Sequence, residues 1–284
     1  MRSSNRMNTP FRKPDGYIPP KGPQETETLI KLTIGNKSLK LVKYESSKEI
    51  TFYIGGHTIY CIYASLYKDK GNILPVGTLN KIRYDQVCSL ENNFMRGIDT
   101  NMILKLLLSY ISRNYPSVNH LSFNDTSSRP CDNGESVNLA FMSYLLHGKT
   151  WYENHFGAFL EKRDLTTFNK YESDFQNRKN TTNWDSFIIQ MNKILQMPIP
   201  ENELQELYTQ SATWHEFFKT IHNRLDISEF CVHVQPWLDR FMNLYFKLNL
   251  IGLQYQMPVK DYGVNYIEGT YQRGGRKYTR RVGR

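Results

Sequence analysis

The sequence is poor in alanine and in long apolar runs. Four alanines occur among 284 residues, against 24 asparagines and 19 tyrosines. The longest apolar stretches, 102–111 and 248–253, are shorter than the about 20 residues that a bilayer-spanning helix needs. The first 28 residues contain five prolines and no apolar h-region, and the prolines would break the amphipathic helix of a transit peptide. The composition therefore argues against a membrane-spanning protein and predicts cytosolic synthesis.

Clustered cysteines and metal-ligand motifs are also missing. The four cysteines lie far apart and form no CxxC motif: Cys61, Cys88, Cys131 and Cys231. This spacing indicates neither a zinc site nor a dense disulfide scaffold, so a reducing compartment is expected. Cys131 could form a thiolate pair with His120, His147 or His155 only if folding brought them together. His215 and His222 are too few for a metal site, and we expect no metal.

Basic charge is concentrated at the two ends. The net charge is +9, of which residues 1–23 carry +4 and residues 273–284 carry +6, leaving 25 basic and 26 acidic residues between them. The basic residues of the C-terminal segment are Arg273, Arg276, Lys277, Arg280, Arg281 and Arg284. Such a segment is typical of a flexible arm that binds nucleic acid or another polyanion, such as an acidic protein surface. The alternative is a solubilising or targeting tail.

Residues 29–89 alternate between apolar and polar positions. This period predicts about five antiparallel strands, with turns at 35–36, 55–56 and 70–72, where Gly and Asn tolerate positive φ. The period then changes to that of a helix over 102–111, which Pro116 ends, and a strand is expected at 118–123. The sequence thus predicts an α/β fold with an antiparallel-to-mixed sheet and crossover helices.

A polar loop, 124–134, follows the strand at 118–123. Asn124 and Asp125 come at the carboxyl end of this strand, where open α/β sheets bind ligands, so they are candidate substrate-loop residues, with an ordinary turn as the alternative. Helical spacing resumes from Glu135 to Gly148.

Beyond Arg163 only helical patterns are evident. They cover 184–195, 201–208, 214–225 and 236–251, with a capping box at Thr213 and Glu216, Pro236 as a first helical residue and Gly252 as a C-terminal residue. We expect a proline-containing disordered lead (1–28), an α/β domain (29–162), an all-helical subdomain (163–258) and a basic flexible tail (259–284).

The order of meander, helix, strand and helix, with the segments Arg96-Gly97-Ile98-Asp99-Thr100-Asn101 and Trp151-Tyr152-Glu153-Asn154-His155-Phe156-Gly157, resembles the GNAT (GCN5-related) N-acetyltransferase fold. In that family a loop of the form R/Q-x-x-G-x-G/A before a helix holds the pyrophosphate of acetyl-CoA. The resemblance assigns this cofactor to Arg96, Gly97, Ile98, Thr100 and Asn101. Here Asp99 and Asn101 replace small residues, and Asp99 adds a negative charge.

The same resemblance implies a catalytic residue. Tyr152 takes the position of the tyrosine that protonates the departing thiolate, with Trp151 and Phe156 as pocket walls. The alternative is that these three aromatic residues are core packing.

Two segments, 147–156 and 274–281, are similar to segments of proteins from nucleocytoplasmic large DNA viruses, the giant viruses. The many Asn and Tyr residues, whose codons are A/T-rich, agree with such a genome. The resemblance implies a setting in a viral factory of the host cytoplasm or in the virion. Two functions follow as hypotheses. One is an acyl-CoA-dependent N-acetyltransferase-like protein, and the other is a non-enzymatic, virion-associated protein whose basic ends bind nucleic acid.

Overall fold

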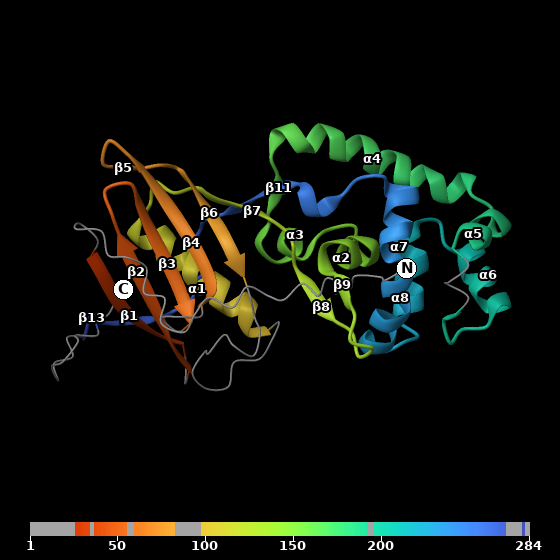
Figure 1. Cartoon of the computed structure of the whole chain (residues 1–284), viewed down its shortest axis with the longest axis horizontal. Coiled ribbons are helices and arrows are strands. Elements are labelled where there is room, and N and C mark those ends of the chain that lie inside the picture. The colour runs from red at the N-terminus through yellow and green to blue at the C-terminus, as the bar shows by residue number, and fades with distance from the viewer. Residues whose placement is uncertain are drawn as a thin grey trace, which may run out of the picture. The chain divides into compact units, whose positions relative to one another are not determined.

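The computed structural model describes residues 26–34, 37–55, 60–82, 98–191, 196–270 and 280–281 (Figure 1). The chain divides into two compact units, which are residues 1–117 with 261–284 (unit 1) and residues 118–260 (unit 2). Both units contain helices and strands, so the chain is a mixed α/β protein. Among the helices of the described residues, none is long and apolar enough to cross a bilayer.

Unit 1 is built on an antiparallel sheet. Its strands are β1 (Thr26–Ile34), β2 (Lys37–Glu45), β3 (Glu49–Gly55), β4 (Tyr60–Asp69), β5 (Asn72–Ile73), β6 (Val76–Ile82), β12 (Ile267–Thr270) and β13 (Arg280–Arg281). The order β6-β4-β3-β2-β1-β12-β13 confirms the predicted meander, and β5 pairs with the end of β4. Lys70 and Gly71 form the predicted turn between β4 and β5, with φ of 47° and 83°. β12 and β13 come from the segment expected to be a flexible tail.

Helix α1 (Ile98–Asn114) covers the sheet of unit 1 and confirms the predicted helix (Figure 1). Leu104, Leu107 and Ile111 are fully buried, and the ring of Phe52 on β3 lies 6.0 Å from that of Tyr110. The guanidinium of Arg113 donates to the Asp261 carboxylate at 2.8 and 2.9 Å. This ion pair fixes the returning C-terminal segment to the end of α1.

Unit 2 contains three paired strands and a separate hairpin. β7 (His120–Asn124), β11 (Gln254–Pro258) and β10 (Phe159–Leu160) pair antiparallel in the order β10-β11-β7, and β8 (Ser128–Pro130) pairs with β9 (Ser136–Asn138). The strand predicted at 118–123 is confirmed as β7. The prediction of an all-helical subdomain over 163–258 is wrong, because this range contains strand β11. The prediction of a loop over 124–134 is wrong at 128–130, which form strand β8.

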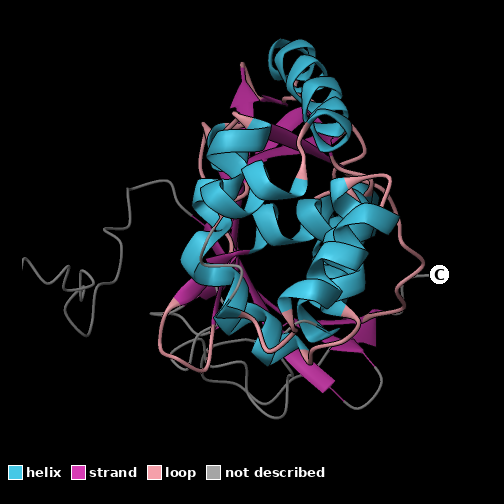
Figure 2. Ribbon diagram, turned by 90° about the vertical axis from the view of Figure 1, so that its right-hand side faces the viewer, coloured by secondary structure: helices cyan, strands magenta, loops and turns pink. Residues whose placement is uncertain are grey.

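Helices make up most of unit 2 and are drawn cyan in Figure 2. They are α2 (Leu139–His147), α3 (Trp151–Phe156), α4 (Lys162–Thr181), α5 (Trp184–Gln190), α6 (Glu201–Gln210), α7 (Trp214–His222), α8 (Ile227–Phe241), η2 (Met242–Phe246) and η3 (Leu250–Gly252). Their core is aromatic. Trp214, Phe217 and Phe218 on α7 are fully buried, and the ring of Trp214 lies 5.2 Å from that of Phe241 on α8.

The starts of α7 and α8 follow side-chain caps rather than a proline. The capping box of Thr213 and Glu216 is confirmed at the start of α7. The start predicted at Pro236 is wrong, because Asp226 and Glu229 form a capping box that begins α8 nine residues earlier and leaves Pro236 inside the helix. The left-handed residue that follows η2 is Lys247, with φ of 64°, whereas Gly252 ends η3. α2 begins at Leu139 and not at Glu135, because the side chain of Asn138 accepts from the Phe141 N–H.

A disulfide joins Cys131, beside the β8–β9 hairpin, to Cys231 on α8, with 5.6 Å between the Cα atoms. Cys61 is also disulfide-bonded. The Cys131 thiolate pair with a histidine is therefore ruled out. Spacing along the sequence could not indicate this bridge, because its two cysteines are 100 residues apart.

Candidate active site

The residues assigned to the cofactor lie at the start of α1. Arg96 and Gly97 are outside the described residues, and Ile98 is the first residue of the helix. Thr100 and Asn101 are half-buried in its first turn, and Asn101 Oδ1 is buried without a hydrogen-bond partner among the described residues. The first four N–H groups of a helix have no acceptor within it, so this turn has backbone donors for an anion.

Tyr152 is held by a short helix with a defined cap at each end. Thr150 and Glu153 form a capping box at the start of α3, in which the Thr150 N–H donates to Glu153 Oε2 at 2.6 Å. Gly157 ends the helix in the left-handed region, with φ of 66°. Because α3 is fixed at both ends, the direction of the Tyr152 side chain is fixed as well, and only 6% of the residue is exposed.

Aromatic rings surround Tyr152. Its ring centroid lies 4.6 Å from Phe123 on β7 and 5.0 Å from Trp151, and Trp151 lies 5.5 Å from Phe156. Phe123 also stacks on Tyr255 of β11, with 5.7 Å between centroids. The predicted wall residues, Trp151 and Phe156, do lie around Tyr152, and Phe156 is a buried core residue.

Asp125 is buried directly after β7. Its Oδ1 accepts from the Ser127 N–H at 3.1 Å and from the Ser127 hydroxyl. Its Oδ2 and the hydroxyl of Tyr255 are both buried without a hydrogen-bond partner among the described residues, and each residue is 1% exposed. Buried polar atoms are normally paired, so two unpaired oxygens here indicate a place for a water or a ligand atom.

We call Asp125, Tyr152 and Tyr255 the acid cluster, because the charge of Asp125 acts on both tyrosines. Burial raises the pKa of Asp125, and the hydrogen bonds from Ser127 oppose this. Burial and the nearby charge of Asp125 raise the pKa of Tyr152. Burial, then the charges of Glu153 and Asp125, raise the pKa of Tyr255. Both hydroxyls therefore stay protonated at physiological pH.

Tyr255 was missed by sequence reasoning, although a weak signal was present. Leu253, Tyr255 and Met257 are buried while Gln254 and Gln256 between them are partly exposed, which is the alternation of a strand. Asn124, also nominated from the sequence, makes a structural contact. Its side-chain amide donates to the Leu253 carbonyl at 3.1 Å, so it fastens the end of β7 to the chain entering β11.

The remaining candidates are not part of this cluster. Arg273, Arg276, Lys277 and Arg284 lie outside the described residues, and Arg280 and Arg281 are described only as the backbone of β13. Among described residues, no three His, Cys, Asp or Glu side chains are placed to hold a metal ion. His215 instead bonds the Leu145 carbonyl at 2.9 Å and the Gln176 amide nitrogen at 2.7 Å.

No protein-family model, curated protein or solved structure matches this chain.

Proposed function

We propose that this chain is an acyl-CoA-dependent N-acetyltransferase-like protein in which Tyr152 is the proton donor. The observation that carries the proposal is that Tyr152 and Asp125, two residues nominated separately from the sequence, are both buried at the carboxyl end of β7, where Phe123 contacts both Tyr152 and Tyr255. The order of meander, helix α1, strand β7 and helices α2 and α3 supports the resemblance to the acetyltransferase fold.

Bound acetyl-CoA would supply an acetyl group activated as a thioester. Within unit 1 taken by itself, the backbone donors of Thr100 and Asn101 fit the phosphate role that the resemblance assigns to them. Tyr152 keeps its hydroxyl proton because the site is buried, and can deliver it to a leaving group. Asp125 Oδ2, which has no hydrogen-bond partner among described residues, can take up the proton that an attacking amine loses.

The first experiment is thermal unfolding with and without millimolar acetyl-CoA, since a ligand at about 100 times its Kd stabilises a fold by about 2.7 kcal/mol. An upward shift supports the proposal, and turnover is then measured on a panel of amines. We expect Tyr152→Phe to lower kcat about 10²-fold or more while keeping the thermal shift. Tyr245→Phe is the matched control, because Tyr245 is a buried tyrosine that bonds Gln190 instead. The absence of both shift and turnover, or full turnover by Tyr152→Phe, would contradict the proposal.

The first turn of α1 has a test of its own. Asp99 would put a negative charge beside the cofactor phosphates, so Asp99→Gly should tighten coenzyme A binding. Unchanged affinity in a protein that does bind coenzyme A would place the cofactor elsewhere.

A second candidate function uses the C-terminal charge. The six bases of residues 273–284, with no acid among them, favour an interaction protein that binds nucleic acid or another polyanion. Removing residues 273–284 should abolish a salt-sensitive association with nucleic acid. If the slope of log affinity against log salt stays the same after truncation, the tail is not the binding segment.

A further inference from the structure

The antiparallel sheet of unit 1 has two chemically different faces. Phe52 and Ile54 of β3 belong to the apolar face that α1 covers, and neither is exposed (Figure 1). Successive residues of a strand belong to opposite faces, so Tyr53 is on the other one. The register places three more tyrosines on the face of Tyr53, namely Tyr44 on β2 and Tyr63 and Tyr67 on β4. We call this surface the tyrosine face.

The rings of the tyrosine face are stacked and partly exposed. Tyr53 and Tyr63 are register partners, and their rings lie within 5° of parallel, with 4.8 Å between centroids. The ring of Tyr44 meets that of Tyr53 edge-on, at 84°. Tyr67 is 37% exposed, and the other three residues are half-buried. A nucleobase has a flat π-face that stacks on such rings with little dependence on the base sequence.

Hydrogen bonds between side chains hold two of these rings in place. The hydroxyls of Tyr67 and Thr78 lie 3.1 Å apart. The Asn80 amide donates to the Ser65 oxygen at 3.2 Å, and the Ser65 hydroxyl donates to that of Tyr63 at 3.2 Å. The rings are therefore positioned before a ligand binds, which reduces the entropy that binding would cost.

Basic residues occupy one row of register positions on the tyrosine face. Lys40 on β2 directly opposes Lys31 on β1. Lys31 and Arg280 both oppose Gly269 of β12, one from each side. Lys40 lies four residues before Tyr44 in β2, so the row belongs to the tyrosine face. Like charges directly opposite each other destabilise a sheet, so this row is best explained by an anionic partner.

The acidic residues of the tyrosine face are kept apart from this row. Those in the described strands lie in or beyond the row of Tyr44, toward the other end of the face: Glu27, Glu49 and Asp69. A further basic residue, Lys81 on β6, opposes Tyr63. The stacked pair of Tyr53 and Tyr63 therefore lies among the basic register positions, and the charge at this end of the face is complementary to a polyanion.

We propose that the tyrosine face of unit 1 binds single-stranded nucleic acid, with phosphates along the row of Lys31 and Lys40 and a base stacked against Tyr53 and Tyr63. The inference deepens the second candidate function, on which it rests, by naming the form of nucleic acid and a site outside the C-terminal segment. A duplex fits less well, because its bases are stacked on one another and their π-faces are not available to the rings.

The test measures fluorescence anisotropy of a labelled oligothymidylate over a range of salt concentrations, with the same strand in a duplex for comparison. We expect the single strand to bind at least about tenfold more tightly than the duplex, which corresponds to about 1.4 kcal/mol. Tyr53→Leu and Tyr63→Leu should each weaken binding about tenfold and leave the salt slope unchanged, because stacking releases no counterions. Tyr171→Leu, which changes a half-buried tyrosine of α4, is the matched control and should have no effect.

A second measurement needs no variant and so does not depend on how Tyr53→Leu or Tyr63→Leu folds. An oligonucleotide containing 5-iodouracil is crosslinked to the unmodified protein by near-ultraviolet light, and the attached peptides are identified by mass spectrometry. Crosslinks should fall on β3 or β4, since stacked aromatic side chains react with this base. Crosslinks confined to unit 2 or to residues 273–284 would overturn the proposal.

The truncation of residues 273–284 separates this site from the tail. It should lower the salt slope, because phosphate contacts are lost, and keep both the preference for single strands and the crosslinks to β3 or β4. If truncation alone weakens binding and both tyrosine variants bind normally, the tail is the site and this proposal is wrong. If the tyrosine variants alone weaken binding, the tail hypothesis fails and this proposal holds. Equal affinity for the duplex, or no binding of the single strand, would also overturn it.

Discussion

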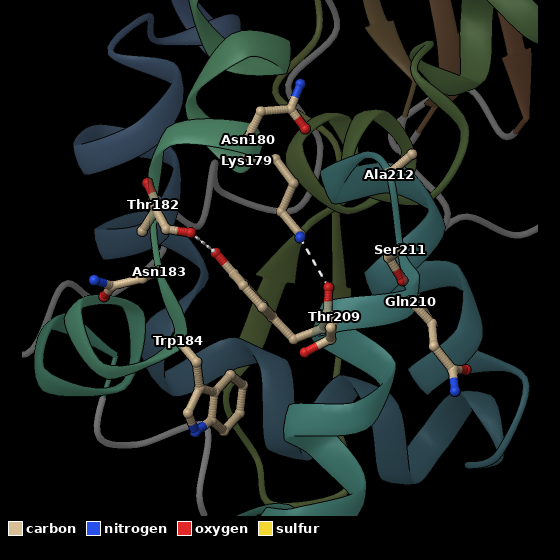
Figure 3. Close-up of a pocket in the computed structure, with 10 residues that line it drawn as sticks. Lys179, Asn180, Thr182, Asn183, Trp184, Thr209, Gln210, Ser211 and Ala212 are labelled. Atoms are coloured by element: carbon tan, nitrogen blue, oxygen red, sulfur yellow. Dashed lines mark hydrogen bonds between the residues drawn. The ribbon is translucent and has the colours of Figure 1, made fainter.

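Asp125 and Lys179 are two buried ionisable groups of unit 2 that are accommodated in opposite ways. Lys179 has the Tyr208 carbonyl at 2.8 Å (Figure 3) and the Tyr208 ring at 3.7 Å, both suited to a positive charge. Asp125 has Ser127 on one oxygen and no partner among described residues on the other. The carbonyl and the ring favour the lysine charge and so oppose the burial that lowers its pKa, whereas Oδ2 of Asp125 has no partner among the described residues. A buried polar group without a partner lowers the stability of the fold, so its presence in a core is better explained by a role in binding or catalysis.

Removing the Cys131–Cys231 disulfide should have the largest effect, and it should affect the surroundings of Lys179 more than those of Asp125. Lys179 lies within the segment between Cys131 and Cys231, whereas Asp125 and Tyr255 lie outside it. We expect the double variant Cys131→Ser, Cys231→Ser to lose about 2–5 kcal/mol of stability, measured by urea unfolding. Hydrogen exchange should rise more in α4 and α6 than in β7 and β11. Equal changes in both regions would show that the bridge does not distinguish them.

Lys179→Met removes the donor to the Tyr208 carbonyl and leaves that carbonyl unsatisfied. We expect a loss of about 1–3 kcal/mol in the free energy of unfolding, and a much smaller loss for Lys179→Arg, which keeps a donor. Urea titrations of both variants measure the difference. If Lys179→Met were as stable as the unmodified protein, the Tyr208 carbonyl and ring would contribute nothing to stability through the lysine charge.

His215 is a third buried ionisable group, and both of its ring nitrogens have partners. Burial lowers its pKa from 6.5, so the folded state binds fewer protons than the unfolded state. Its stabilising contribution is therefore complete above about pH 6.5 and is lost as the pH falls through the lowered folded pKa.

One such proton changes the free energy of unfolding by at most about 1.4 kcal/mol per pH unit. His215→Asn should flatten this dependence, since asparagine can donate to the Leu145 carbonyl and does not titrate. Urea unfolding at several pH values between about 7.5 and 5 measures the slope. An unchanged slope would assign the acid sensitivity to other groups.

Asp125→Asn is expected to raise stability at about pH 7 by about 1 kcal/mol, because the amide can keep the bonds from Ser127 without a buried charge. The pKa of Asp125 is raised in the folded state above its ordinary value of 3.8. Its contribution to stability is therefore fully present below about pH 3.8 and is lost as the pH rises through the folded pKa. The advantage of asparagine should therefore shrink in acid. A variant that is more stable and catalytically inactive would support the role of this carboxyl, and a less stable variant would show that the charge is satisfied.

Local patterns in the sequence determined much of unit 1. Alternating residues predicted the meander, Lys70 and Gly71 formed the expected turn, and the apolar face at 102–111 became α1. In unit 2 the capping box of Thr213 and Glu216 was predicted in the same way. These features depend on residues a few positions apart, so the local sequence is enough to specify them.

Tertiary structure alone decided the rest. β11 is a short strand that follows helices, and its pairing with β7 joins residues 130 positions apart, as in Gln254 with Asn124. The Cys131–Cys231 bridge, the approach of Tyr255 to Asp125 and the burial of Lys179 against Tyr208 likewise join distant parts of the chain. No local propensity encodes such contacts, because they form only when the packing of the whole unit outweighs the entropy of closing long loops.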